Sequence, residues 1–309
     1  MADYYFIVNP HSRTGHGLKI WRTQLYPYLR SVPFSWKVFF TRYSGHCTQI
    51  VSQLTKNLKK PVTIVICGGD GTLNEAVNGL AHMELATLAY IPTGSGNDFA
   101  RSLKLTGTPI QMLHSILQKK RELLLDYGIV RAPGKAPRRF IVSSGCGFDA
   151  AITDEALHSR IKSVLNRLGL GKLTYMIIAI RQMIRHRFKR ATIILDDRKV
   201  LHLKKYLFAS AHIQPYEGGG FAFAPSANPS DGLLDLCIVH HLPKFKAICI
   251  LPMALAGKHT GFNGINIFSC RSARIILNEP ARVHTDGETY HPRKEVEFTC
   301  QQQKIHFVC

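Results

Sequence analysis

The chain has 309 residues, of which 45% are hydrophobic and 19% charged. This length suits two domains of about 100–200 residues each, and the composition excludes a disordered polyelectrolyte. Lys and Arg number 40 against 20 Asp and Glu, a formal net charge of +20. This excess predicts a surface that attracts the phosphates of nucleic acid, nucleotides or anionic lipid headgroups, and charge alone does not choose among them.

The first ten residues lack a basic stretch followed by an apolar core, so we expect no secretory signal and a cytoplasmic protein. The longest apolar runs, Tyr175–Ile180 and Ala247–Ala256, are shorter than the ~20 residues that span a bilayer. None of the eight cysteines forms a CxxC pair, and we expect them to be reduced. The pair His240 and His241 lacks cysteines at zinc-finger spacing, so no zinc site is expected there.

Strand-like and helix-like segments alternate in the first third of the chain, which predicts βαβ units and a parallel sheet. The expected strands are Tyr4–Val8, Ser35–Thr41, Pro61–Cys67 and Thr87–Ile91, and the expected helices include Cys47–Leu58 and Leu73–Ala81. Ligands of such sheets bind at the carboxyl ends of the strands. These ends carry Gly, Asn, Thr or Asp, so we expect a binding site at that edge.

From about Asp126 the pattern changes to strands joined by short turns, which predicts a mainly antiparallel second domain interrupted by helices. The expected strands are Tyr127–Val130, Phe140–Ser144, Ala191–Leu195, Leu207–Ala211, Leu233–Val239, Arg274–Leu277, Val296–Thr299 and Ile305–Val308. We therefore expect an α/β domain over residues 1–126 and a β-rich domain over residues 127–309.

Basic residues concentrate in the segment Arg160–Lys205, which holds thirteen Lys and Arg and two acidic residues. Within it, Thr174–Phe188 has the spacing of an amphipathic helix, with Arg181, Arg185 and Lys189 along one face. One interpretation is a solvated helix that packs on its own domain. The other is a surface that binds anionic lipid, with about 1 kcal/mol contributed by each basic residue near a membrane.

A glycine-rich loop, GGDGTLNE, begins at Gly68, directly after a buried strand and before a predicted helix. Glycines let the backbone approach a phosphate, and the amides at a helix N-terminus donate hydrogen bonds to it. The loop is not a Walker A sequence, because it lacks the GK[ST] ending and carries Asp70. A carboxylate beside phosphates suits a bound magnesium ion. The alternative is a plain glycine turn capped by Asp70 and Thr72.

This loop resembles the nucleotide loop of the superfamily of diacylglycerol kinases, sphingosine kinases, NAD kinases and, with Ser for Thr, phosphofructokinases. Further segments resemble the lipid-kinase branch: Asn9-Pro-His-Ser12 its NPxSG loop, Ile91–Arg101 its PxGTxNDFAR segment, and Asp286-Gly-Glu288 its DGE sequence. Their order and spacing extend over nearly the whole chain. The resemblance implies an α/β nucleotide domain followed by a β-sandwich-like domain.

The resemblance also implies roles for individual residues. The expected ATP site consists of Asn9, Pro10, His11, Ser12, Arg13, Thr41, Gly68, Gly69, Asp70, Gly71, Thr72, Leu73, Asn74 and Ser95. Asp98 and Asp126 are expected to join Asp70 in a polar network that orders magnesium waters, with Lys19 as the counter-ion. Glu288 is expected to support Asp286 or the magnesium. A structural magnesium ion is expected on Asn228, Asp231 and the carbonyl of Leu233, although Asp-Gly is also an ordinary turn.

Asp286 is the expected general base, which accepts the proton of the attacking hydroxyl. Without the resemblance, its Asp-Gly-Glu context would indicate a hairpin turn. Two positions depart from the family pattern: Arg13 stands where the family has Gly, and Ser95 replaces Thr. The segment Gly145–Ala150 fits GxGxxA, but the acidic residue of a dinucleotide site is missing about 20 positions later.

We therefore expect a peripheral kinase at the inner face of the membrane that uses ATP and Mg²⁺ to phosphorylate a lipid hydroxyl, with diacylglycerol as the expected acceptor. Phosphatidylglycerol, polyprenols, ceramide and sphingosine-like lipids stay open as acceptors. Anionic phospholipid is the expected surface partner, no nucleic-acid partner is expected, and a homodimer stays open. The alternatives are an NAD-kinase-like activity and a non-catalytic binder of nucleic acid or membrane.

Overall fold

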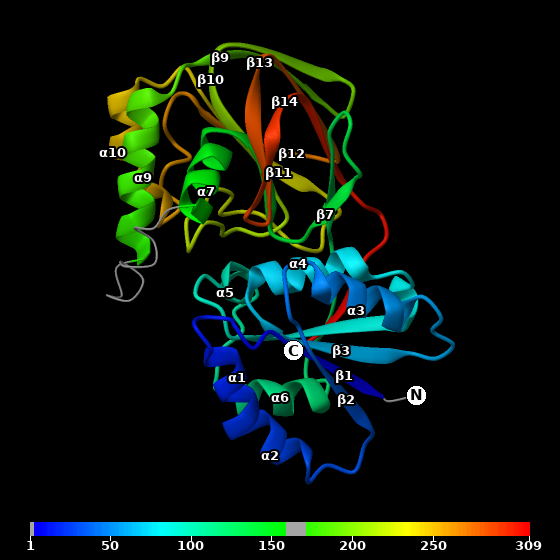
Figure 1. Ribbon diagram of the computed structural model, residues 1–309. Helices are drawn as coiled ribbons and strands as arrows, with labels where there is room; N and C mark the ends of the chain where they lie inside the picture. Colours follow the sequence, from blue (N-terminus) through cyan, green and yellow to red (C-terminus); the bar gives the residue numbers. More distant parts are fainter. Residues whose placement is uncertain (1–2, 159–170) are drawn as a thin grey trace. The chain divides into compact units, whose positions relative to one another are not determined.

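The computed structural model describes residues 3–158 and 171–309. The chain divides into two compact units: Met1–Tyr127 with Gln302–Cys309 form unit 1, and Gly128–Gln301 form unit 2 (Figure 1). The strand Ile305–Val308, which the sequence led us to place in the second domain, therefore belongs to unit 1. Its apolar alternation predicted a strand but could not tell which sheet the strand joins.

Unit 1 is built on a sheet with the strand order β2-β1-β3-β4-β15-β5. The strands are β1 (Tyr4–Val8), β2 (Trp36–Phe40), β3 (Val62–Gly68), β4 (Ala86–Pro92), β5 (Glu122–Leu125) and β15 (Ile305–Val308). Neighbouring strands are parallel except for β15 and β5, which are antiparallel. The predicted parallel sheet is confirmed.

Helices cover both faces of this sheet (Figure 1). The helices α3 (His46–Thr55) and α4 (Asp70–Gly79) lie on one face, and α1 (His16–Ile20), the π-helical η1 (Trp21–Leu25), α2 (Tyr26–Leu29) and α6 (Pro109–Leu117) lie on the other. The second face packs Phe6, Val65 and Ile91 of the strands against Trp21 and Leu25. The short elements η2 (Met83–Leu85) and α5 (Asp98–Ser102) flank β4 along the chain. The edge where β1, β3 and β4 end is thereby left to loops.

Unit 2 is built on an antiparallel sheet, as predicted, with the order β12-β11-β10-β8-β13-β14-β6-β7, while β9 pairs with both β10 and β13. The strands are β6 (Gly128–Arg131), β7 (Arg138–Phe140), β8 (Ser143–Gly147), β9 (Lys189–Leu195), β10 (Lys199–His212), β11 (Leu234–His240), β12 (Ile265–Cys270), β13 (Ser272–Thr285) and β14 (Glu288–Cys300). The short strands β8 and β9 each bridge the long strands β10 and β13, at different parts of their length. This arrangement places the end of β13 beside β8.

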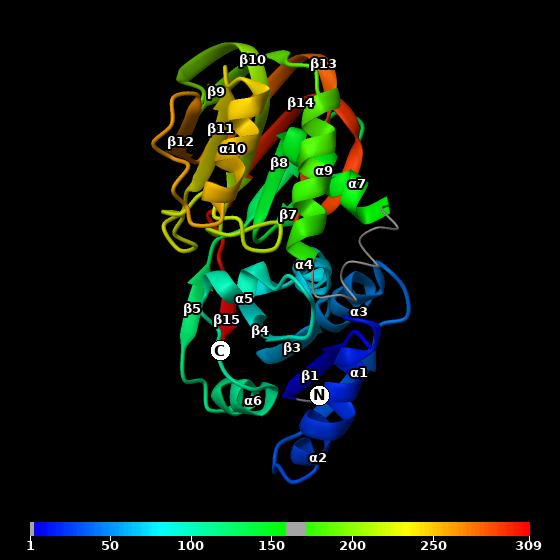
Figure 2. The same ribbon diagram turned by 90° about the vertical axis from the view of Figure 1, so that its left-hand side faces the viewer.

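Helices α7 (Phe148–His158), α9 (Gly171–Arg185) and α10 (Lys244–Ala254) pack on the sheet of unit 2, with α9 beside α10 (Figure 2). Their contacts include Met183 and Ile250 against Phe208 and Val239. The predicted amphipathic helix corresponds to α9, and the part of the basic segment before residue 171 lies outside the described residues. None of the helices in the described ranges is both long and apolar enough to cross a membrane.

Phe307 tests the placement of β15. Its ring is 1% exposed and lies 5.3 Å from the ring of Phe99, so Phe307→Ala should leave a cavity in unit 1 and lower the free energy of unfolding by about 3–5 kcal/mol. Urea denaturation followed by tryptophan fluorescence measures this, because both tryptophans, Trp21 and Trp36, lie in unit 1. The control is His306→Ala on the exposed face of the same strand. Equal midpoints for the two variants would contradict the placement.

Candidate active site

The glycine-rich loop joins β3 to α4 at the carboxyl edge of the sheet. Gly68 ends the buried strand, and its carbonyl accepts a hydrogen bond of 2.7 Å from the amide of Thr93, so the loops after β3 and β4 lie together. A Cβ atom on Gly94 would lie 2.7 Å from Cα of Gly69, closer than real contacts. Only glycine allows this approach of the two backbones. The predicted Gly68–Asn74 loop and the Ser95 segment are therefore brought together.

The loop after β1 joins the same group. Nδ2 of Asn9 donates to Oγ1 of Thr72 at 3.0 Å, and the hydroxyls of Ser12 and Thr93 lie 2.7 Å apart and are buried. Thr93 is a contact that the sequence prediction missed. Arg13 has a φ of 44°, in the left-handed region that favours glycine, so Arg13 occupies a position where its side chain costs strain.

Thr41 and Glu75 connect the loop after β2 to this edge. Thr41 is buried, and its amide donates to the carbonyl of Val8 at 2.9 Å. The carboxylate of Glu75 accepts the amides of Gly45 at 2.8 Å and Cys47 at 3.1 Å, at the start of α3. Glu75 thereby supplies the acceptor that a helix N-terminus needs. Its place in GGDGTLNE was visible in the sequence, but this role was not predicted.

The predicted acidic network forms in part. The Asp70 carboxylate accepts the amides of Asp98 at 2.9 Å and Phe99 at 3.3 Å and so caps α5. Both carboxylates converge near Gly96, where an added Cβ would lie 3.5 Å from Oδ2 of Asp70 and 3.8 Å from Oδ2 of Asp98. Burial, with the charges of Asp70 and Asp98, raises the pKa of Tyr90 well above its usual range.

The cations that pair with Asp98 and Asp126 were not predicted from the sequence. Asp98 pairs with Arg101, and Asp126, which is fully buried, pairs with Lys304. Lys19, the expected counter-ion, is exposed on α1. Lys304 was missed because it is 178 residues away from Asp126 in the chain, and only the return of β15 into unit 1 brings the two together.

Asp286 lies in the turn between β13 and β14. Its carboxylate accepts backbone N–H bonds from Ile141 at 2.9 Å, Val142 at 3.0 Å and Ser143 at 2.9 Å, and its own amide donates to the carbonyl of Ser143. Asp286 reaches this position with a left-handed φ of 45°. Backbone amides therefore fix both carboxylate oxygens. Glu288 pairs with Arg138 at 2.5 Å, and its expected support of Asp286 or the magnesium stays a prediction.

The predicted structural magnesium residues share one loop before β11. Oδ1 of Asn228 accepts the amide of Ser230 at 3.2 Å, and Oδ1 of Asp231 accepts the amide of Leu233 at 3.0 Å. Both side chains are exposed. These bonds are those of Asx turns, which is the alternative that the Asp-Gly sequence left open. The metal role stays a prediction.

A buried polar cluster near Asp286 and the turn between β13 and β14 was not predicted. One ligand atom each of Asp149, Glu217 and His284 lies within 4.8 Å of the others, and Nε2 of His284 lies 3.1 Å from Oδ2 of Asp149. A Cβ on Gly145 would lie 1.8 Å from that oxygen, so the glycine makes room for the pair. The members of this cluster are far apart in the chain, so no local pattern indicated it. In the sequence, Gly145 was part of the GxGxxA segment, whereas in the structure it makes room for Asp149 and His284.

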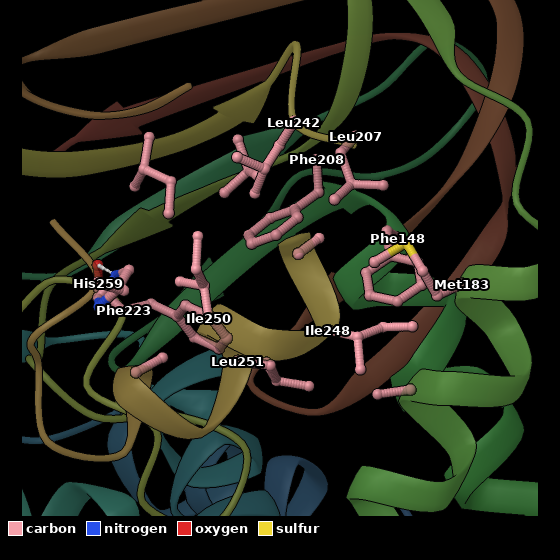
Figure 3. Close-up of a pocket in the computed structure, with 15 residues that line it drawn as sticks. Phe148, Met183, Leu207, Phe208, Phe223, Leu242, Ile248, Ile250, Leu251 and His259 are labelled. Carbon is pink, nitrogen blue, oxygen red and sulfur yellow. Dashed lines mark hydrogen bonds between the residues drawn. The ribbon is translucent and has the colours of Figure 1, made fainter. Parts of the chain in front are cut away.

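An apolar pocket lies between the sheet of unit 2 and its helices (Figure 3). Phe148 and Met183 stand at one end of the pocket, and Phe223 and His259 at the other. The remaining lining side chains are Ala179, Leu207, Phe208, Val239, Leu242, Ala247, Ile248, Ile250, Leu251, Ala254 and Ile265. Such a lining suits hydrocarbon and offers His259 alone among the lining residues as a polar side chain.

Gly94 and Gly71 test the loop geometry with opposite signs. Gly94→Ala should force the backbones of two loops apart and lower the free energy of unfolding of unit 1 by about 1–3 kcal/mol. Gly71→Ala meets no atom within 4 Å in the first turn of α4, so it should raise that free energy by about 0.5–1 kcal/mol. Urea denaturation followed by tryptophan fluorescence measures both. Equal shifts in the same direction would contradict the close approach.

Comparison with known proteins identifies the two units. Residues 3–126 match the family model of the diacylglycerol kinase catalytic domain, and residues 141–307 match that of the YegS C-terminal NAD kinase beta sandwich-like domain. The chain is 28% identical to YtlR of Bacillus subtilis (strain 168), named as a candidate lipid kinase, over 93% of this chain and 94% of YtlR. It is 27% identical to the diacylglycerol kinase of the same organism, over 86% of this chain and 85% of that protein.

The fold is shared with solved structures. A crystal structure of a candidate diacylglycerol kinase from Bacillus anthracis str. Sterne superposes with a TM-score of 0.75 at 23% identity and covers 99% of this chain and 97% of its own. The second of the two family matches alone spans more than half of the 309 residues. The chain therefore belongs to the diacylglycerol kinase and YegS family of lipid kinases, which are phosphotransferases.

Proposed function

We propose that the protein transfers the γ-phosphoryl group of ATP to the hydroxyl of diacylglycerol and so forms phosphatidate. The observation that carries the choice of a lipid with acyl chains is the apolar pocket, which lies in the same unit as Asp286. A soluble acceptor such as NAD would need polar groups that converge on it, and this pocket offers apolar side chains and His259.

The loops at the carboxyl edge of the sheet in unit 1 would hold the nucleotide. The N-terminus of α4, preceded by Gly68 and Gly69, provides backbone amides and a positive dipole end for phosphate oxygens. Mg²⁺ fits the donor set there, because the carboxylates of Asp70 and Asp98 converge and Mg²⁺ prefers oxygen ligands, several of them waters. When bound, the ion would neutralise charge on the phosphates.

Asp286 would act as the general base. The lipid hydroxyl oxygen bonds to the γ-phosphorus as the bond between that phosphorus and the bridging oxygen to ADP breaks, and the hydroxyl proton moves to the Asp286 carboxylate. An ionised carboxylate accepts hydrogen bonds only, so the amides of Ile141, Val142 and Ser143 hold it as an oxygen acceptor in one orientation. Such fixed geometry is what phosphoryl transfer demands.

We further propose that α9 and α10 form the face that contacts an anionic membrane. Both helices expose large apolar side chains, among them Ile184 at 70% and Phe245 at 79%. Exposed cations stand beside them: Arg185 on α9 and Lys246 on α10. The helices lie side by side, since Nζ of Lys244 donates to the carbonyl of Ile184 at 2.9 Å.

This face borders the pocket. Inner residues of the same helices, Met183 on α9 and Ile250 and Leu251 on α10, line the pocket (Figure 3). An acyl chain that leaves the bilayer at this face would therefore exchange one apolar environment for another and avoid exposure to water. Basic residues near an anionic leaflet add about 1 kcal/mol each, which holds the face at the surface.

A lipid panel with Mg²⁺ and radiolabelled ATP tests the proposed reaction. Diacylglycerol should give labelled phosphatidate at a higher kcat/KM than phosphatidylglycerol, polyprenol, ceramide, sphingosine or NAD. Asp286→Asn should lower kcat about 10²- to 10⁴-fold, because it removes the base. Asp197→Asn is the matched control, since Asp197 is also an aspartate in a left-handed turn, with a φ of 52°, but lies exposed between β9 and β10.

Each result has one meaning. A higher kcat/KM for another lipid would replace diacylglycerol as the acceptor, and preference for NAD would exclude a lipid. Wild-type turnover by a folded Asp286→Asn protein would exclude Asp286 as the base.

Vesicle sedimentation tests the membrane face. Phe245→Asp and Ile184→Asp should each weaken binding to phosphatidylglycerol vesicles by about tenfold or more, because each replaces an inserted apolar group by an anion. Val200→Asp is the control, because Val200 is half-exposed on β10 and belongs to neither helix. Binding of the wild-type protein should also weaken as salt rises. If the three variants weaken vesicle binding equally, or if vesicle binding does not depend on salt concentration, α9 and α10 do not form the membrane-binding face.

A further inference from the structure

We propose that Asp149 and His284 form a buried ion pair that positions the carboxylate of Asp286 and keeps a positive charge beside it. This inference rests on the proposed function, in which Asp286 accepts the proton of the acceptor hydroxyl. His284 and Asp149 would be positioning residues, since neither is placed against a substrate.

The pair is built into the fold. The side chains of His284 and Asp149 are 4% and 6% exposed, with Nε2 and Oδ2 3.1 Å apart. They come from different elements, since His284 lies on β13 and Asp149 in the first turn of α7. A side chain at Gly145 would meet both, because its Cβ would lie 1.8 Å from Oδ2 of Asp149 and 2.7 Å from Nε2 of His284. The glycine on β8 is therefore required by the pair.

The same stretch of β8 also holds Asp286. Gly145 pairs with His284 and Ser144 with Thr285 in the antiparallel ladder. The next residue, Ser143, donates its amide to the Asp286 carboxylate, and its carbonyl accepts the Asp286 amide. Oγ of Ser144 donates to the carbonyl of His284 at 2.6 Å. The ion pair thus ties α7 to β13 two residues before Asp286. Loss of the pair would loosen the register that places the carboxylate on its amides.

The charges around His284 favour its protonated form. Burial lowers the pKa of His284, but the hydrogen bond to Asp149 and the charges of Asp149, Glu217 and Asp286 outweigh burial and raise the pKa to about 9. For Asp149, burial has the opposite effect and raises the pKa of the carboxyl group, while the hydrogen bond to His284 lowers it. We place the proton on the imidazole, because Glu217 and Asp286 add negative charge on its side.

Other titratable groups that pack around the pair leave this charge in place. On β10, burial lowers the pKa of His212 to about 4, so His212 is neutral at pH 7. On β8, burial raises the pKa of the Cys146 thiol, which also stays neutral. On α7, Asp154 forms an ion pair with Arg282 at 3.2 Å and accepts a hydrogen bond from the hydroxyl of Thr289. Thr289 lies on β14, opposite His284. The charged set that faces His284 is then Asp149, Glu217 and Asp286.

The sign of the pH dependence follows. The folded-state pKa of His284 lies above its ordinary value. The ion pair therefore contributes fully to the free energy of unfolding below about pH 6.5, and this contribution is lost as pH rises through about 9. Deprotonation of His284 breaks the ion pair that ties α7 to β13 two residues before Asp286, so the Asp286 carboxylate is held less firmly on its amides. Turnover should therefore fall on the alkaline side as His284 loses its proton.

The test compares kcat for diacylglycerol between pH 6 and 10 in the wild-type protein, His284→Gln and His202→Gln. Gln keeps a hydrogen bond to Asp149 but cannot carry the charge. His284→Gln should lower kcat about tenfold or more at pH 7.5 and abolish the alkaline fall, with the KM for ATP within about twofold of wild type. His202 is exposed on β10, so His202→Gln should keep the wild-type kcat and the alkaline fall.

A measurement without activity keeps the inference testable if His284→Gln does not fold. NMR of the wild-type protein labelled with ¹⁵N in histidine should show one buried imidazole that stays protonated to about pH 9. In Asp149→Asn the same signal should titrate at lower pH, because the partner charge is gone. A neutral His284 at pH 7 in the wild-type protein would overturn the ion pair.

Three further results would also overturn it. One is an alkaline fall retained in His284→Gln, which indicates a structural role alone. Another is a wild-type kcat in His284→Gln while Asp286→Asn is inactive, in which case the proposed function stands and the pair fails. The third is one equivalent of a transition metal by mass spectrometry of the purified protein, since Asp149, Glu217 and His284 would then be its ligands. An active Asp286→Asn would instead remove the base on which the inference rests.

Discussion

The capture of the Asp286 carboxylate by the backbone amides of Ile141, Val142 and Ser143 is the constraint on which the rest of unit 2 depends. It requires a left-handed turn at Asp286 and sets where β13 ends against β8. The chain then continues from β8 into α7, whose first residues are Phe148 and Asp149. One of these lines the apolar pocket and the other meets His284. The proposed base, its ionic support and the proposed lipid pocket therefore share one structural frame.

In unit 1, close backbone contacts and internal ion pairs hold the loops and carboxylates in place. The loops after β3 and β4 touch at Gly69 and Gly94, where a side chain would not fit. The carboxylates of Asp98 and Asp126 are already paired with Arg101 and Lys304. Acidic groups that are held in place before a ligand arrives lose little order when it binds. The positive charge that the sequence displays is thus used inside the unit as well as at its surface.

Local patterns in the sequence predicted much of this. The parallel and antiparallel sheets and membership of the lipid-kinase family are confirmed, because hydrophobic periodicity and glycine spacing are local properties of the chain. The partners of these residues were predicted poorly. Lys19 was expected as the counter-ion of the Asp70 network, whereas the Lys304 pair with Asp126 was not predicted. The pair of Glu288 with Arg138 was not predicted either. A pairing between distant segments leaves no local pattern to detect.

The sequence by itself determined the two kinds of sheet, the glycine-rich loop at Gly68 and the Asp-Gly-Glu turn at Asp286, since each follows from neighbouring residues and their backbone preferences. Only the tertiary structure decided that β15 returns to the first sheet, and that Asp149 lies beside His284 across 135 residues of chain. The excess of basic residues shows the same division. Its amount is a property of composition, whereas the place of Arg185 and Lys246 beside exposed apolar side chains depends on how α9 and α10 pack.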